Sequence, residues 1–151
     1  MLNQYLTNIF ILKTNLYNLY FNIKGEGATS FHQSIKEDIN NVNSMYINLA
    51  ELIKKIGGYP IMKLEEIKNI STIKEIPSKD YQISEANNIV LNNLNLINNM
   101  NKQVGEYALK KNDLDSINLV LSFDKYLQQA LWLLKMNKLI IHFHLLENYH
   151  I

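Results

Sequence analysis

The sequence contains no cysteine and no arginine, and its net charge is only +1. The lack of cysteine excludes disulfides, thiolate metal ligands and a cysteine nucleophile. The lack of arginine removes the side chain that best forms paired hydrogen bonds to phosphate. The composition therefore argues against a protein that holds nucleic acid by bulk charge.

Long hydrophobic runs are also missing. The most apolar stretch, residues 139–146, is interrupted by two histidines and is far shorter than the roughly 20 residues that span a bilayer. The first residues lack the basic segment and the small-residue cleavage site of a signal peptide. We therefore expect a cytoplasmic protein with no membrane partner.

Residues that break helices are few, and they divide the 151-residue chain into long uninterrupted pieces. Pro60 and Pro77 are the only prolines, and two pairs of glycines mark further breaks. Apolar residues in the second piece are spaced alternately by four and three, at Ile35, Ile39, Val42, Tyr46, Leu49, Ile53 and Ile56. This spacing predicts an amphipathic helix. The other pieces have similar periods, so the chain is predicted to be all-α, with four helices of about 22–28 residues.

Polar residues mark where these helices begin. Ser30, with Gln33 three residues later, is predicted to form a capping box. Ser84 and Asp113 are predicted N-caps of the third and fourth helices. The asparagine-rich stretch 92–101 keeps helical spacing and is interpreted as a solvated helix face.

The connection between the second and third helices, about residues 57–83, is much longer than the usual two to eight residues. It has room for a short helix at 62–69. One long crossover is typical of ferritin-like bundles. The predicted fold is therefore a ferritin-like four-helix bundle over residues 1–139 with a short extra helix in the crossover, followed by a tail over 140–151.

Five short segments, in order, resemble Dps-type mini-ferritins. They are Asn-Leu-Tyr-Phe-Asn-Ile-Lys-Gly at 18–25, Phe-His at 31–32, Ala-Glu with Gly-Gly-Tyr-Pro over 50–60, Ser-Thr-Ile-Lys-Glu at 71–75, and Asn-Asp-Leu-Asp-Ser with a later Leu-Trp over 112–132. The resemblance covers about residues 3–138. It implies a hollow shell of twelve identical subunits that oxidises Fe(II), stores the ferric mineral and, in some members, binds DNA.

The resemblance also implies an iron site shared by two subunits, with two histidines and an acid from one and two acids from the other. The corresponding positions here are Tyr20, His32, Lys36, Ile47 and Glu51. Only His32 and Glu51 keep the expected chemistry. The Lys36 ammonium has no lone pair and repels a cation, and the Ile47 side chain offers no donor atom. We expect a metal-free site in which Lys36 pairs with Glu51 of a neighbouring subunit, while His32 and Glu51 remain candidates for a weakly held iron.

Two further regions carry candidate metal ligands. Asp113 and Asp115 correspond to acids that line the family's ion-entry pores, although N-capping also explains them. In the tail, three residues spaced by three are predicted to share one helix face, namely His144, Glu147 and His150. The alternative is a tail that packs its apolar side chains on a neighbour. Phe21 and Trp132 are expected to be core or interface anchors.

The sequence thus predicts a Dps-like shell protein for iron storage and stress protection, with impaired or lost Fe(II) oxidation. Whether it is an enzyme stays open at this point. The alternative is a non-catalytic structural or DNA-associated shell subunit, alone or mixed with an active paralogue. A ferroxidase with a rearranged site of Tyr20, His32 and Glu51 is a third interpretation. DNA binding is expected to be weak or absent, because no lysine precedes Lys13.

Overall fold

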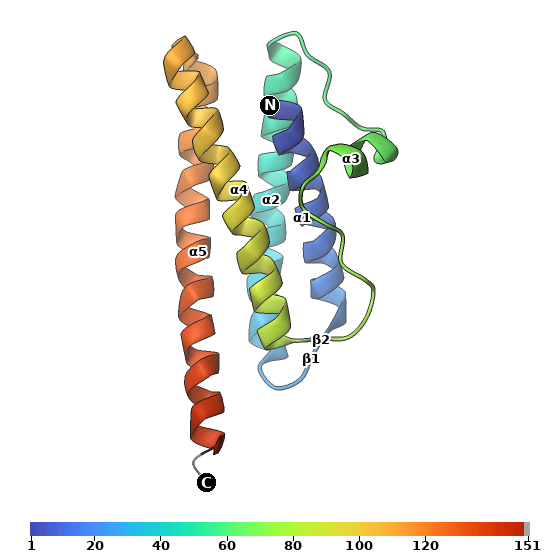
Figure 1. Cartoon of the computed structure of the whole chain (residues 1–151), viewed down its shortest axis with the longest axis vertical. Helices are drawn as coiled ribbons and strands as arrows, with labels where there is room; N and C mark the ends of the chain where they lie inside the picture. The colour runs from blue at the N-terminus through green and yellow to red at the C-terminus, as the bar shows by residue number, and fades with distance from the viewer. Residues whose placement is uncertain (150–151) are drawn as a thin grey trace.

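The computed structural model describes residues 1–149, and within them the chain is almost entirely helical. Its helices are α1 (Leu2–Asn22), α2 (Ala28–Lys55), α3 (Leu64–Ile70), α4 (Ile83–Lys111) and α5 (Leu114–Tyr149). Figure 1 shows α1, α2, α4 and α5 as an elongated bundle, with the short α3 on its side in the crossover. The predicted all-α ferritin-like bundle, including the short crossover helix, is confirmed.

The core lies where the apolar stripes of the four long helices meet. Leu6, Leu49, Leu94 and Leu127 come from four different helices, and each is fully buried. Four aliphatic side chains removed from water in this way stabilise the fold by roughly 1.5–3 kcal/mol each. Of the periodic residues predicted on the second helix, Ile35, Ile39, Val42, Leu49 and Ile53 are buried, Tyr46 is partly buried, and Ile56, after the helix end, is exposed.

Two of the three predicted N-caps were wrong. The second helix begins at Ala28, with Gly27 as its N-cap in the left-handed region at φ 79°. A β-carbon there would lie 3.0 Å from Ile83 Cδ1, so glycine allows both the backbone turn and the close approach. The helix that was predicted as the third, α4, begins at Ile83 rather than after Ser84.

The third predicted cap is confirmed. The Asp113 carboxylate accepts hydrogen bonds from the Ser116 backbone nitrogen at 3.2 Å and the Ser116 hydroxyl at 2.6 Å. These two bonds hold the pKa of Asp113 below its usual value. The carboxylate thus satisfies a free backbone donor in the first turn of α5.

Asparagine side chains of α1 hold the crossover segment, residues 56–82, against the bundle. The Asn8 Oδ1 atom accepts hydrogen bonds from the backbone nitrogens of Thr72 at 3.0 Å and Ile73 at 2.8 Å. Asn15 accepts one from the Ile76 backbone nitrogen at 3.1 Å. The α1 asparagines that bond to this segment are Asn3, Asn8, Asn15 and Asn18. Side-chain amides therefore replace the regular backbone pairing that the crossover lacks.

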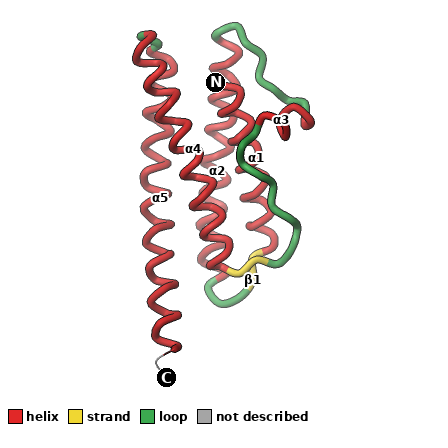
Figure 2. The backbone as a smooth tube through the Cα atoms, in the orientation of Figure 1, coloured by secondary structure: helices red, strands yellow, loops and turns green. Residues whose placement is uncertain are grey.

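A short parallel bridge closes one end of the bundle. The strands β1 (Ile23–Lys24) and β2 (Tyr81–Gln82) pair Ile23 with Tyr81 and Lys24 with Gln82, as Figure 2 shows in yellow near the foot of the bundle. Each strand has only two residues, so no alternating pattern was available to predict it.

The last helix continues past the other three at the C-terminal end (Figure 1). Residues 140–149 of the predicted tail form the end of α5 and are not a separate element. Within the described residues, no helix is both long and apolar enough to cross a membrane.

Candidate metal centre

At the first two of the predicted ligand positions, Tyr20 and His32, two aromatic rings are stacked. Tyr20 near the end of α1 lies on His32 of α2, with ring centroids 3.8 Å apart and planes tilted by only 12°. Both side chains are half-buried. A phenol ligates iron as a phenolate and must lose its proton to do so. The stack therefore offers one imidazole, that of His32, and one phenol, that of Tyr20, which ligates only after it loses its proton.

The remaining three positions follow one face of α2, and their side chains reach solvent. Lys36 and Glu51 are exposed, and Ile47 is 55% exposed. His32 and Glu51 are separated by 19 residues, or roughly 28 Å along a helix that rises 1.5 Å per residue. They cannot hold one ion within a single chain. Any site that uses both must be assembled from two chains.

Within residues 1–149, no group of three or more histidine, aspartate or glutamate side chains is arranged to hold a metal ion. Glu51 and Asp115 do line one shallow cavity between α2 and α5, together with Asn118. Asp113 is separate from this cavity and is engaged with Ser116 as a cap.

The tail candidates are only partly brought together. His144 Nδ1 lies 3.8 Å from Glu147 Oε2, and both side chains are largely exposed. His150 lies outside the described residues. The predicted face of α5 therefore carries a histidine–carboxylate pair one turn apart.

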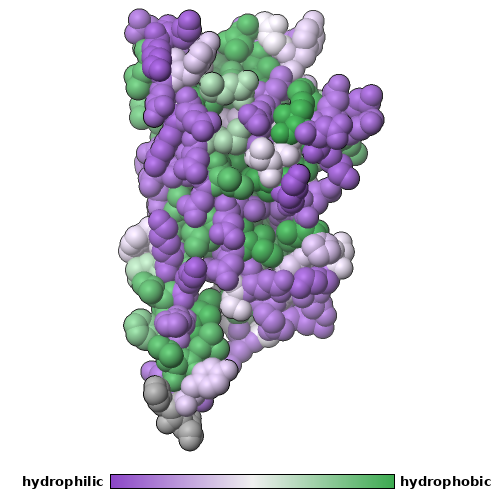
Figure 3. Space-filling model, viewed as in Figure 1, coloured by the Kyte–Doolittle hydropathy of each residue, from purple (hydrophilic) through white to green (hydrophobic). Residues whose placement is uncertain are grey.

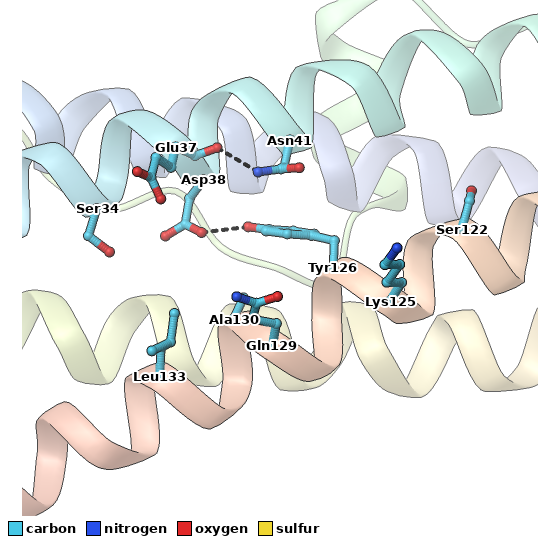
Figure 4. Close-up of a pocket in the computed structure, with 10 residues that line it drawn as sticks. All are labelled: Ser34, Glu37, Asp38, Asn41, Ser122, Lys125, Tyr126, Gln129, Ala130 and Leu133. Carbon is cyan, nitrogen blue, oxygen red and sulfur yellow. Dashed lines mark hydrogen bonds between the residues drawn. The ribbon is translucent and has the colours of Figure 1, made fainter.

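A buried carboxyl that sequence reasoning missed lies between α2 and α5. Asp38 is about 9% exposed and accepts a hydrogen bond of 2.7 Å from the Tyr126 hydroxyl. Figure 4 shows this pair on the wall of a cavity of about 370 Å³, with Glu37 and Lys125 also lining it. Asp38 comes three residues after Ile35 and four before Val42, so helical spacing places it on the buried face.

Burial dominates the protonation of this pair. The pKa of Asp38 is raised to about 6, mainly because burial removes solvation; the Tyr126 hydrogen bond lowers it in part, and the nearby Glu37 charge adds to the rise. Burial and the neighbouring carboxylate also raise the pKa of Tyr126 well above its usual value. The pair therefore exchanges a proton near neutral pH at the carboxyl and not at the phenol.

Comparison with known proteins agrees with the fold. The model of the ferritin-like domain family matches residues 1–138. The chain therefore belongs to the ferritin-like family. Within that family it is of the Dps type, as the five motifs predicted.

The similar proteins are distant in sequence and close in structure. A "DNA protection during starvation protein" of Helicobacter pylori is 22% identical over 125 residues, which cover 83% of this chain and 87% of that protein. The crystal structure of Dps from Staphylococcus aureus is 25% identical, with a TM-score of 0.85 and 91% of each chain covered. Antigen TpF1 from Treponema pallidum is 20% identical, with a TM-score of 0.88 and coverage of 91% and 88%.

Proposed function

We propose that this protein is a Dps-like shell subunit that binds and stores iron and protects against oxidative stress, with Fe(II) oxidation at the inter-subunit site impaired or lost. Membership of the ferritin-like family and similarity to Dps proteins support the general role. The loss of oxidation is inferred from one observation. Lys36 and Ile47 lie on the exposed face of α2 where the family supplies acids, and neither side chain can ligate a cation.

Exposed apolar side chains near this face support assembly with further copies. Phe21 is 72% exposed and stacks on Tyr17, and Ile47 lies on the adjoining helix. Apolar groups of this size are usually covered in the assembled state. We propose a homo-oligomeric shell of twelve subunits. Light scattering should then give about twelve times the 17.6 kDa mass of one chain.

In that shell, Lys36 is proposed to pair with Glu51 of the partner subunit. The two residues are 15 positions apart on α2, roughly 22 Å, so the pair requires a second chain. The ammonium would take the place of the lost cation and keep the carboxylate from being buried alone. His32 and Glu51 would then hold iron only weakly.

Oxidation of Fe(II) by peroxide, followed by ferric absorbance, tests the impaired site. The natural chain should oxidise Fe(II) little faster than a protein-free blank. The variant Tyr20→His/Lys36→Asp/Ile47→Asp restores the expected ligands and should oxidise it clearly faster. A matched control adds the same negative charge on exposed positions of α4, with the substitutions Asn88→Asp, Asn92→Asp and Asn99→Asp.

The outcomes separate the interpretations. Rapid oxidation by the natural chain would refute the impaired site and favour a rearranged centre of Tyr20, His32 and Glu51. A restored variant no faster than the α4 control would mean that these positions do not form the site. No iron retained by an intact shell would favour the non-catalytic structural alternative, including a subunit mixed with an active paralogue.

DNA association is proposed to be weak or absent, although several relatives are named for DNA protection. The first basic side chain is Lys13, and the net charge is +1. Phosphate contacts dominate the affinity of non-specific binding and fall steeply with salt. Retention of the assembled protein on duplex DNA at about 150 mM salt would contradict this expectation.

A further inference from the structure

Beyond Leu134, α5 faces the rest of the bundle only across open cavities, and none of its side chains from 135 to 149 is buried. Leu134 is the last fully covered side chain on this helix, yet the helix continues to Tyr149. That extension is roughly 22 Å long at 1.5 Å per residue. The family model stops at residue 138, so most of the extension is a feature of this chain beyond the family match.

A row of large apolar side chains runs along this extension on the side away from the bundle. We name it the outer stripe, and its members are Trp132, Met136, Leu139, Phe143 and Leu146. All five are exposed, and Phe143 is 63% exposed. Figure 3 shows hydrophobic side chains gathered over the lower part of α5. Leaving this much apolar surface in water is unfavourable, which indicates a binding surface.

The spacing of the outer stripe specifies the shape of what covers it. Its members are separated by four, three, four and three residues, which is the seven-residue repeat of a coiled-coil seam. Such a seam fits another helix with the same repeat. Leu133 and Ile140, both exposed, flank the seam and widen the apolar surface on one side.

We propose that the outer stripe is a self-association surface on which a second copy of this chain lays its own α5 in parallel. Charge favours a like partner, because residues 139–149 carry Glu147 as their only formal charge besides two histidines. In a parallel pair, the flanking position of His142 faces that of Glu147 five residues later on the other copy. An antiparallel pair that sets Trp132 beside Leu146 would instead place His142 near Lys135 of the other copy, which brings two basic side chains together.

Disulfide cross-linking in the full-length protein tests both the contact and its direction. The chain has no cysteine, so a single introduced thiol reports alone. Leu146→Cys lies on the seam and should cross-link to its own copy under mild oxidation, because parallel pairing brings the two α-carbons within disulfide range. Asn148→Cys is a matched control, since Asn148 is exposed nearby but faces the cavity beside Gly27 and Gln82.

Disruption of the seam supplies the second measurement. Adding Leu139→Glu and Phe143→Glu should abolish the Leu146→Cys cross-link while helix content by circular dichroism is retained. If the glutamate substitutions perturb folding, the pair Leu139→Ala and Phe143→Ala repeats the test. Equal cross-linking at residues 146 and 148, or cross-linking that survives either pair, would overturn the proposal. A cross-link formed only between Trp132→Cys and Leu146→Cys chains would overturn the parallel direction.

The proposal does not depend on iron chemistry. Failure of the iron assay would leave the cross-link unchanged, and loss of the cross-link would leave any oxidation by the restored variant unchanged.

Discussion

Replacement of Asn8 by alanine should loosen the crossover segment from the bundle. Asn8 is fully buried, and its Oδ1 atom accepts from two backbone nitrogens, those of Thr72 and Ile73. It also accepts from the Ser71 hydroxyl at 3.0 Å. Alanine leaves the two backbone nitrogens without this partner, while the Ser71 hydroxyl keeps the Ile73 carbonyl oxygen as an acceptor at 3.0 Å. Each buried donor left unsatisfied costs about 1–3 kcal/mol. Alanine is also the better helix former, by roughly 0.6 kcal/mol.

We therefore expect Asn8→Ala to lower the free energy of unfolding by about 3 kcal/mol. Urea denaturation at one fixed protein concentration measures the loss, because assembly adds a concentration-dependent term. Asn92→Ala is the matched control, since Asn92 is exposed in the middle of α4, and the better helix propensity of alanine should leave its stability unchanged or raise it by up to about 0.6 kcal/mol. A loss for Asn8→Ala no larger than that of the control would refute the anchoring role.

Three further results are expected. The pKa of Asp38 is raised in the folded state, so ionisation of this carboxyl lowers the stability of the fold as pH rises from about 4 to 6. Asp38→Asn should remove this pH dependence. Urea midpoints of both proteins at pH 4 and pH 7 measure the difference. Asp113→Ala should lose about 1 kcal/mol by removing the N-cap bonds to Ser116, measured by thermal unfolding against Asp115→Ala. Truncation after Leu139 should abolish zinc or nickel binding if the tail is the site, and calorimetric binding that persists would assign the metal elsewhere.

The helices and the crossover could be predicted because apolar spacing carries them. Leu49 follows the period of α2, and it is buried as expected. The exact first residues of the helices could not be predicted, because Gly27 and Gln82 precede their helices as N-caps without a side-chain hydrogen bond. In each case a serine two or three residues later, Ser84 or Ser30, is the residue type that usually caps a helix, and the sequence pattern favours it.

The role of asparagine was the main error in the polar pattern. Asn98 and Asn101 lie in the stretch predicted to be a solvated face, yet both are buried. Asn101 accepts a hydrogen bond from the Tyr5 hydroxyl at 3.0 Å across the core. An asparagine side chain is stable both in water and in a buried site where its hydrogen bonds are satisfied, so composition alone does not distinguish an exposed asparagine from a buried one.

The candidate positions Lys36 and Ile47 lie outside the five motifs and follow only from their spacing to the motifs at 31–32 and 50–60, so their place in a metal centre stays a prediction. The distance between His32 and Glu51 required the structure, because only a helix of known length separates them by about 28 Å. The burial of Asp38 could have been predicted from the sequence. A charged residue on the apolar face of a helix indicates a buried partner, and here that partner is Tyr126.

The turn between α4 and α5 has a consequence for the order of folding. Asn112, at φ 52°, and Asp113 are the only residues between the two helices, so α4 and α5 form a hairpin with short-range contacts. The α1–α2 hairpin is also closed by a short connection. Local contacts of this kind need little loop closure and form early, whereas docking the hairpins must also order the whole crossover segment. During refolding, amide protection should thus rise in α4 and α5 before it rises around Ile73. The hydrogen bonds from the α1 asparagines to the crossover segment would form last, after the helices have paired.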